Sequence, residues 1–392
     1  MLHRRERIKT LMMILGMFFF LFLLGCQHDS SLSEREYMTD PIYSGQDPTK
    51  SNESEDGKET NTNEERDRVG QARTQDGEVA RLIFIGDTMM AGKVADVMEE
   101  RGNDYPLSEF MPILQESDLV IANLETAVGS SGNTLAEVKK YAFQTAPERF
   151  QLFEPLREQL VFSLANNHGM DAPLNETMSE LDRLGYSYIG VGENSQSAIQ
   201  PYVQEINGIE IAVLAASRVI PTADWMAGPE RAGMASAYSD EPLLSTIEQW
   251  KNQVDYVIVY IHWGEELANE PNQIQLELEQ KMRGAGADII IGSHPHVLQA
   301  IEWKGKKDLT AFSMGNFVFT TSVNAVANDT AALEIHLSKD QIEHVQLWPG
   351  EVQFGLIRYL IDTVERERVF QRIRELSPTI TVGPDGRITK SF

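Results

Sequence analysis

Apolar runs and amphipathic stretches alternate along this chain from about residue 79 onward. The apolar runs have the length and composition of buried β-strands, and the stretches between them repeat apolar residues at helical spacing. The expected strands span residues 80–86, 118–123, 160–165, 187–191, 209–216, 254–261, 287–292, 309–313, 331–337 and 342–348. The expected helices span residues 93–101, 107–115, 148–157, 173–184, 242–252 and 273–285. This alternation predicts an α/β fold with buried strands.

The C-terminal part departs from this alternation. No helix separates the last two expected strands, which predicts an antiparallel addition to the sheet. Beyond them, residues 354–376 space their apolar side chains for burial on one side of one or two helices. We therefore expect a domain over residues 79–350 and a helical extension over residues 351–392 that packs on it.

The first residues have the form of an export signal. Four basic residues precede a 14-residue apolar run, which is short for a membrane span. Leu23-Leu24-Gly25-Cys26 resembles the lipobox of bacterial lipoproteins, which predicts a signal peptide over residues 1–26 that is cleaved before Cys26, the lipid attachment site. The alternative is an uncleaved signal anchor. Either reading predicts a location at the cell membrane, with the rest of the chain on its extracytoplasmic face.

Residues 27–78 are rich in polar and acidic residues and poor in apolar ones, so they cannot bury enough surface to fold. We expect a disordered acidic linker that tethers the domain to the membrane. The whole chain of 392 residues has a formal net charge of -25, and Lys and Arg form no long run beyond the N-terminus. This distribution argues against nucleic acid as a partner, because binding a phosphate backbone requires clustered basic residues.

Polar and ionisable residues directly follow five of the expected strands. The five stretches are RLIFIGDTMMAG, DLVIANLETAVG, LVFSLANNHGMD, YVIVYIHWGEE and DIIIGSHPHV. In open α/β sheets, ligands bind in the crevice outside the carboxyl ends of the strands. The oxygen and imidazole donors offered here suit hard or borderline divalent cations. The candidate metal ligands are Asp87, Glu125, Asn167, His262, His294 and His296.

The metal prediction depends on the whole series, because a single histidine near an apolar run is more often a structural residue. The strongest local signal is Gly292-Ser293-His294-Pro295-His296, where a tight turn can aim two imidazoles at different ions. Other polar residues at the same strand ends are candidate contacts to a substrate. These residues are Asn123, Glu265 and Asn316.

His168 and Asp171 form a candidate catalytic pair beside Asn167. The imidazole can face a substrate as a proton donor, and the acidic partner would orient it and raise its pKa, which favours a general acid. The alternative assigns Asn167 and Asp171 to turn and N-cap roles before the helix expected at residue 173. Both roles can hold at once.

Several motifs together resemble one known family. In order, they are FIGDTMMAG, NLETAVG, LANNHGMD, GVGENSQSAIQP, HWGEE, GSHPHVLQ and FSMGNFVF, within about residues 80–320. They are similar to those of the bacterial capsule-synthesis CapA/PgsA group, which is built on the calcineurin-like metallophosphoesterase fold. The resemblance implies a four-layer α-β-β-α sandwich with a central double sheet. It also implies a role in making or retaining poly-γ-glutamate at the cell surface.

The resemblance implies individual roles as well. The ligands would be Asp87 and His296 on one ion, Asn167, His262 and His294 on the other, and Glu125 between them. His168 would be the acid. Two positions depart from the broader phosphoesterase pattern, because Met89 stands where a histidine is usual and Glu125 stands where an aspartate is usual. These departures leave open one ion or two, with Mn, Mg, Fe and Zn as candidates, or a binding site without hydrolysis.

Three functions are compatible with these residues. The leading expectation is a membrane-anchored protein that takes part in poly-γ-glutamate synthesis, export or anchoring through a metal-dependent cleft. Its expected partners are the membrane, polyglutamate synthase subunits and the anionic polymer. The alternatives are a general extracytoplasmic metal-dependent phosphoesterase and a non-catalytic partner that binds polymer or stabilises a synthase. The sequence alone does not separate them, because the same donors serve catalysis, binding and folding.

Overall fold

The computed structural model describes residues 79–132, 139 and 141–391. The expected signal peptide, Cys26 and the acidic linker over residues 27–78 lie outside the described residues, and those expectations stay predictions. Within the described part, no helix combines the length and the hydropathy needed to cross a bilayer.

The larger sheet contains ten strands in the described part of the chain, in the order β19-β20-β17-β16-β1-β2-β5-β6, with β15 on β1 and β18 on β17. These strands are β1 (Ala80–Thr88), β2 (Leu119–Leu124), β5 (Leu160–Ser163), β6 (Ser187–Ile189), β15 (Asn316–Val318), β16 (Asp329–Leu337), β17 (Ile342–Gln353), β18 (Leu356–Tyr359), β19 (Ile380–Val382) and β20 (Arg387–Lys390). β1, β2, β5 and β6 are parallel, and β16 and β17 are antiparallel to their neighbours, as the missing helix between them predicted.

The smaller sheet has six strands among the described residues, in the order β13-β14-β12-β11-β9-β8. These are β8 (Tyr202–Ile206), β9 (Ile209–Ser217), β11 (Tyr256–His262), β12 (Ile289–Ser293), β13 (Ile301–Trp303) and β14 (Leu309–Ala311). The central strands β9, β11, β12 and β14 are parallel. Two short ladders complete the strands described: β3 (Ala127–Val128) with β4 (Gln144–Thr145), and β7 (Val191–Gly192) with β10 (Gly233–Met234).

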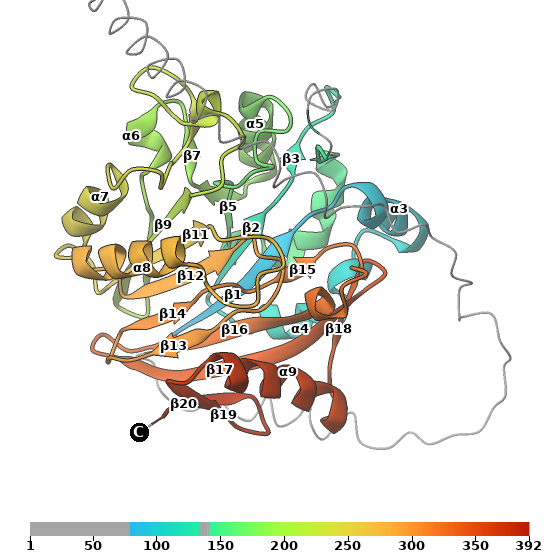
Figure 1. Ribbon diagram of the computed structural model, residues 1–392. Coiled ribbons are helices and arrows are strands. Elements are labelled where there is room, and N and C mark those ends of the chain that lie inside the picture. Colours follow the sequence, from blue (N-terminus) through green and yellow to red (C-terminus); the bar gives the residue numbers. More distant parts are fainter. Residues whose placement is uncertain (1–78, 133–138, 140, 392) are drawn as a thin grey trace, which may run out of the picture. The chain divides into compact units, whose positions relative to one another are not determined.

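Helices cover the outer faces of both sheets (Figure 1). The α-helices are α3 (Gly92–Arg101), α4 (Met111–Leu114), α5 (Leu174–Leu184), α6 (Ser195–Ala198), α7 (Leu243–Trp250), α8 (Gln273–Ala285) and α9 (Thr363–Leu376). The 3-10 helices are η1 (Tyr105–Leu107), η2 (Pro147–Gln159), η3 (Ala223–Trp225) and η4 (Ala325–Asn328). The boundaries of α8 follow from its ends, because Asn272 caps its first turn and Gly286 ends it in the left-handed region.

Three apolar clusters show how the layers pack. One joins the inner faces of the two sheets, with Phe84 of β1 and Ile258 of β11 among its members. A second packs the outer face of the larger sheet against α3, α4, α5 and η2, and a third packs the smaller sheet against α7 and α8. Side chains that alternate along each strand therefore bury both faces of both sheets. The expected four-layer α-β-β-α sandwich is confirmed.

Three expected elements differ in the structure. The helix expected at 107–115 is reduced to the short α4, and the one expected at 148–157 is the 3-10 helix η2. Proline explains both differences, because Pro112 at the start of α4 and Pro155 inside η2 cannot donate an α-helical hydrogen bond. The helix expected within residues 354–376 is shorter than expected, because α9 begins only at Thr363.

The C-terminal residues instead contribute strands as well as a helix. Phe354 and Gly355 both have positive φ and form the turn of a hairpin, so the segment that was expected to be helical begins with β18 on β17. After α9 the chain returns as β19 and β20, and β20 pairs with β17. Val369 and Phe370 of α9 join the cluster between the sheets, which extends that core beyond the smaller sheet.

Candidate metal centre

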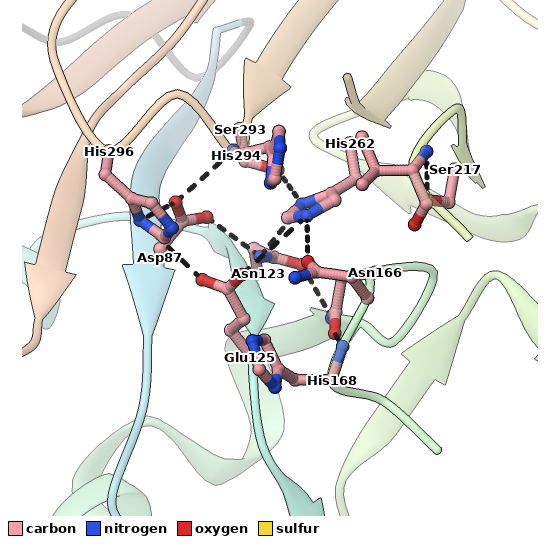
Figure 2. Close-up of polar contacts among 12 residues, drawn as sticks. Asp87, Asn123, Glu125, Asn166, His168, Ser217, His262, Ser293, His294 and His296 are labelled. Carbon is pink, nitrogen blue, oxygen red and sulfur yellow. Dashed lines mark hydrogen bonds and ion pairs between the residues drawn. The ribbon is translucent and has the colours of Figure 1, made fainter. Parts of the chain in front are cut away.

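The predicted ligands converge at the carboxyl ends of the central strands (Figure 2). Asp87 lies at the end of β1, Glu125 follows β2, His262 ends β11, and His294 follows β12. Gly86 makes this convergence possible, because a Cβ there would lie 2.0 Å from the Gly315 carbonyl oxygen. The strand bulges at this point, and the Asp87 N–H donates to the same carbonyl at 2.9 Å.

A chain of amides holds Asp87 in place. Asn123 Nδ2 donates to Asp87 Oδ1 at 2.8 Å, and Asn123 Oδ1 accepts a hydrogen bond from Asn166 Nδ2 at 3.0 Å. Asn123 is 0% exposed. Both ends of the amide are used inside the protein to orient a carboxylate, and its predicted contact with substrate stays a prediction.

Glu125 is the most unusual residue of the site. It is 0% exposed, and neither of its carboxylate oxygens has a hydrogen-bond partner in the described part of the chain. Oε1 lies 3.7 Å from His262 Nε2, and Oε2 lies 4.0 Å from His296 Nδ1. Burial, with the nearby Asp87 carboxylate, raises the pKa of Glu125 well above its usual range. A buried carboxylate with unused acceptors fits a cation site.

His262 and Asn167 meet on one side of Glu125. Asn167 Oδ1 lies 2.7 Å from His262 Nε2, and His262 Nδ1 lies 2.9 Å from Ser293 Oγ. Burial lowers the pKa of His262 well below its usual range, and the nearby imidazole of His294 adds to the effect. The imidazole is therefore neutral at neutral pH, which is the form that binds a metal.

His294 and His296 lie in the turn after β12, and both have positive φ, 96° and 57°. His294 is 6% exposed, and its Nδ1 has no hydrogen-bond partner among the described residues. His296 Nδ1 lies 3.1 Å from Asp87 Oδ2 and 2.8 Å from Asn316 Oδ1. Burial alone would lower the pKa of His296, but the carboxylates of Glu125 and Asp87 outweigh it and raise this pKa to about 10. Carboxylates that hold a proton this strongly also attract a divalent cation.

Asn316 is a buried positioning residue. It is 2% exposed, and besides its contact with His296 its amide donates to the Ala327 carbonyl at 3.2 Å. Asn316 therefore supports an imidazole, the usual role of a second partner behind a metal ligand, and its predicted contact with substrate stays a prediction.

The donor atoms fit divalent metal binding. Two buried groups place all their donor atoms within 4.8 Å of one another: Glu125, His262 and His294 form one, and Asp87, Glu125 and His296 form the other. Glu125 belongs to both, which matches its predicted bridging position. The thioether of Met89 accepts a hydrogen bond from the Ala91 N–H at 3.1 Å, so it is used by its own backbone.

His168 and Asp171 form the predicted pair. His168 Nδ1 lies 2.6 Å from Asp171 Oδ2, and the ring packs on Phe143 with centroids 4.4 Å apart. Asp171 raises the pKa of His168 as expected, but burial lowers this pKa and outweighs the carboxylate, so the net shift is downward. The imidazole is neutral at neutral pH, so it fits a proton acceptor better than the expected acid.

Lys139 is a site residue that the sequence did not reveal. Its Nζ lies 2.7 Å from Asp171 Oδ1 and 3.0 Å from His168 Nδ1, and it also donates to the Asn167 carbonyl. Burial lowers the pKa of Lys139, although Asp171 opposes this effect. The lysine is far from these residues along the chain and follows no strand, so no local pattern marked it.

Two glutamates follow His262. Glu265 was one of the predicted substrate contacts, and that role stays a prediction, whereas Glu266 forms a further group of donors with His294 and His296. Both glutamates are exposed. HWGEE offered both residues, and the sequence contained no signal for choosing between them.

The fold and this geometry define a class: an α/β sandwich protein with a candidate divalent-metal centre at the carboxyl ends of its strands. Residues 81–321 match the family model described as "Bacterial capsule synthesis protein PGA_cap". The chain belongs to this family.

Two relatives extend the match. The chain is 32% identical over 285 residues to the "PGA biosynthesis protein CapA" of Bacillus subtilis (strain 168), which covers 71% of this chain and 73% of the relative. It is 30% identical over 320 residues to the "Capsule biosynthesis protein CapA" of Bacillus anthracis, which covers 78% of this chain and 75% of the relative.

Solved structures are less similar. A hypothetical protein from Thermus thermophilus is 15% identical with a TM-score of 0.42, over 70% of this chain and 100% of its own. A Thermus thermophilus sulfate thiohydrolase SoxB in complex with glycerol is 11% identical with a TM-score of 0.37, over 74% of this chain and 46% of its own. These similarities are too low to support any inference about function.

Proposed function

We propose that this protein takes part in the synthesis, export or anchoring of poly-γ-glutamate at the cell surface, through a divalent-metal site at the carboxyl ends of its strands. Family membership and the names of the two relatives support the link to this polymer. The observation that carries the metal part is the buried carboxylate of Glu125, which lies between two groups of donors and has no hydrogen-bond partner among the described residues.

The residues of the chain divide the work of such a site. When bound, a divalent ion would polarise a carbonyl or phosphoryl oxygen of a substrate and stabilise developing negative charge. Asn123 and Asn316 hold Asp87 and His296 in place from behind. His168 turns its Nδ1 toward Asp171, so its Nε2 is the atom left to exchange a proton with a substrate.

A second candidate is hydrolysis of phosphate esters outside the cytoplasm. It is favoured by one observation, the His168–Asp171 pair beside the metal donors, because a proton-exchanging imidazole next to Lewis-acid chemistry suits phosphoryl transfer. This function requires no polymer, which makes it separable by substrate.

We also propose attachment to the membrane by a lipid on Cys26, on the extracytoplasmic face. The Leu23-Leu24-Gly25-Cys26 sequence supports it. A Cys26→Ser chain should lose metabolic lipid labelling and leave the membrane fraction, and unaltered labelling would contradict the proposal.

Complementation tests the polymer function most directly. In a polymer-forming host that lacks its own CapA protein, the wild-type chain should restore surface poly-γ-glutamate, and Glu125→Gln should not. Restoration by both would show that the metal site is not needed. Failure of the wild-type chain, combined with turnover of an aryl phosphate by the purified full-length protein, would favour the phosphoesterase.

A further inference from the structure

Glu266 places an exposed carboxylate at the mouth of the centre. One of its oxygens lies within 4.8 Å of a nitrogen of His294 and a nitrogen of His296. These two histidines belong to different buried groups, since His294 accompanies His262 and His296 accompanies Asp87. Glu266 therefore faces both parts of the centre from the solvent side.

The loop that carries Glu266 is fixed to the turn that carries the two histidines. The Trp263 N–H donates to the Ser293 carbonyl at 3.1 Å, and the Leu267 N–H donates to the Pro295 carbonyl at 2.8 Å. Glu266 lies between these two hydrogen bonds. These two hydrogen bonds therefore fix the distance between the loop that carries Glu266 and the turn that carries His294 and His296.

Backbone strain is concentrated in these two segments. Leu267, His294 and His296 have φ values of 60°, 96° and 57°, in the left-handed region that side chains disfavour. A residue in this conformation persists only where its surroundings impose it. Strain on both sides of one opening indicates that the positions of the side chains there are under functional constraint.

A buried amide pair supports the loop from below. Gln275 and Gln299 are both 0% exposed, and the Gln275 amide donates to Gln299 Oε1 at 2.9 Å. Gln299 in turn donates to the Ala268 carbonyl at 2.8 Å. Gly264 has a φ of 94°, and a Cβ there would lie 2.8 Å from Gln275 Oε1, so the path of the loop has little freedom.

The residues that the structure describes offer no partner that accounts for the Glu266 carboxylate. Within the described residues, Glu266 forms no hydrogen bond and no ion pair at 4.0 Å or less, whereas nearby His294 has a buried Nδ1 without a hydrogen-bond partner. An exposed carboxylate beside two imidazoles in a fixed loop fits a ligand.

We propose that Glu266 is a metal ligand of the centre, shared with His296 at its mouth, and that it shifts the preference of the site toward hard ions such as Mn²⁺ over Zn²⁺. Glu266 would add an oxygen donor to the group formed by Asp87, Glu125 and His296. On that side of the centre, Met89 stands where a histidine is usual, so an imidazole donor is missing. Oxygen ligands favour Mn²⁺ and Mg²⁺, whereas imidazole suits Zn²⁺. The inference depends on the proposed metal centre.

The test is calorimetric titration of the purified full-length chain with MnCl₂ and, separately, with ZnCl₂. Glu266→Gln should weaken Mn²⁺ binding at least tenfold and Zn²⁺ binding less than threefold, since it removes one charged oxygen donor. The matched control is Glu265→Gln, the neighbouring exposed glutamate, which should stay within twofold of wild type for both ions. Equal melting temperatures of the metal-free variants would show that the loop is intact.

Two results would overturn the inference, and they are distinguishable. In the first result, the wild-type chain binds Mn²⁺, and Glu266→Gln binds it as tightly as Glu265→Gln does. The metal centre would then exist, but Glu266 would not be one of its ligands. If the wild-type chain and Glu125→Gln both bind neither ion, the centre itself is absent and the inference fails with it. Partial recovery of Mn²⁺ affinity in Glu266→Asp would support coordination by the carboxylate.

Discussion

Two buried glutamates of this protein have opposite surroundings. Glu125, at the carboxyl ends of the strands, is 0% exposed, and Glu334, in β16 of the larger sheet, is 2% exposed. Glu334 accepts hydrogen bonds from Arg81 Nη2 at 2.8 Å and from Trp348 Nε1 at 2.7 Å, and it also contacts His336. Glu125 has no hydrogen-bond partner among the residues described.

The difference is visible in the proton affinity of the two carboxyl groups. Burial would raise the pKa of Glu334, but His336 and Arg81 outweigh it and hold this pKa at about 2. Burial and Asp87 raise the pKa of Glu125 instead. A buried charge requires compensation. Glu334 obtains it from this chain, whereas Glu125 has the surroundings of a residue that obtains it from a bound cation.

The largest expected effect concerns Glu125 itself. Glu125→Gln should weaken binding of divalent metal on the order of a thousandfold, because it removes a charged donor common to both groups. The same change should raise the free energy of unfolding of the metal-free chain by about 1 kcal/mol, because it removes an uncompensated buried charge. Metal titration and chemical denaturation measure the two effects. If Glu125→Gln greatly lowered the free energy of unfolding of the metal-free chain, Glu125 would have stabilising partners in the protein, as Glu334 has, and the contrast between the two glutamates would fail.

Glu334→Gln should act with the opposite sign. It should lower the free energy of unfolding by about 3 kcal/mol, because the change removes the buried carboxylate that lies 2.8 Å from Arg81 Nη2 and leaves Arg81, among the described residues, only the more distant Glu116, at 3.9 Å. Urea denaturation of the metal-free chain checks this value, and metal affinity should be unaltered. An unchanged free energy of unfolding would mean that the Glu334 carboxylate stabilises the fold no more than an amide does.

Acid should separate the wild-type chain from the Glu334→Gln variant. The folded pKa of Glu334 is about 2 and its ordinary value is 4.5, so the folded state binds this proton less readily. The stability contributed by Glu334, about 3 kcal/mol, is present above pH 4.5 and is lost as the pH falls toward 2. The difference between the two chains should therefore shrink over this interval. A constant difference in the free energy of unfolding between the two chains from pH 6 to pH 2 would contradict this prediction.

The smallest expected effect concerns the support of the centre by Lys139. Lys139→Met should weaken metal binding about tenfold, because Lys139 fixes the backbone of Asn167 and the carboxylate of Asp171. The matched control is Lys93→Met, which removes an exposed lysine paired with Asp96 at 3.3 Å and should have no effect. Equal metal affinities of the two variants would remove Lys139 from the site.

The sequence revealed the parts of the site that depend on strand ends. Asp87, His262 and His294 each follow an apolar strand, and parallel strands bring their carboxyl ends together whatever the details of packing. The continuous apolar strands predicted an α/β fold with buried strands, whereas the four layers were expected only from the family resemblance.

The parts that the sequence did not reveal depend on tertiary contacts. Lys139 reaches His168 from a segment that carries no periodic pattern. Asn123 was predicted to contact substrate because its position at a strand end is visible, whereas the direction of its amide is not. The strands after Gln353 were mistaken for helix because Leu356–Tyr359 has apolar spacing that suits either structure.

The metal content of the purified full-length chain, measured by elemental mass spectrometry beside Glu125→Gln, tests the central claim most directly. We expect at least one divalent ion per wild-type chain after incubation with Mn²⁺ and removal of free metal, and none in the variant. Equal metal content in the two chains, or none in either, would contradict it.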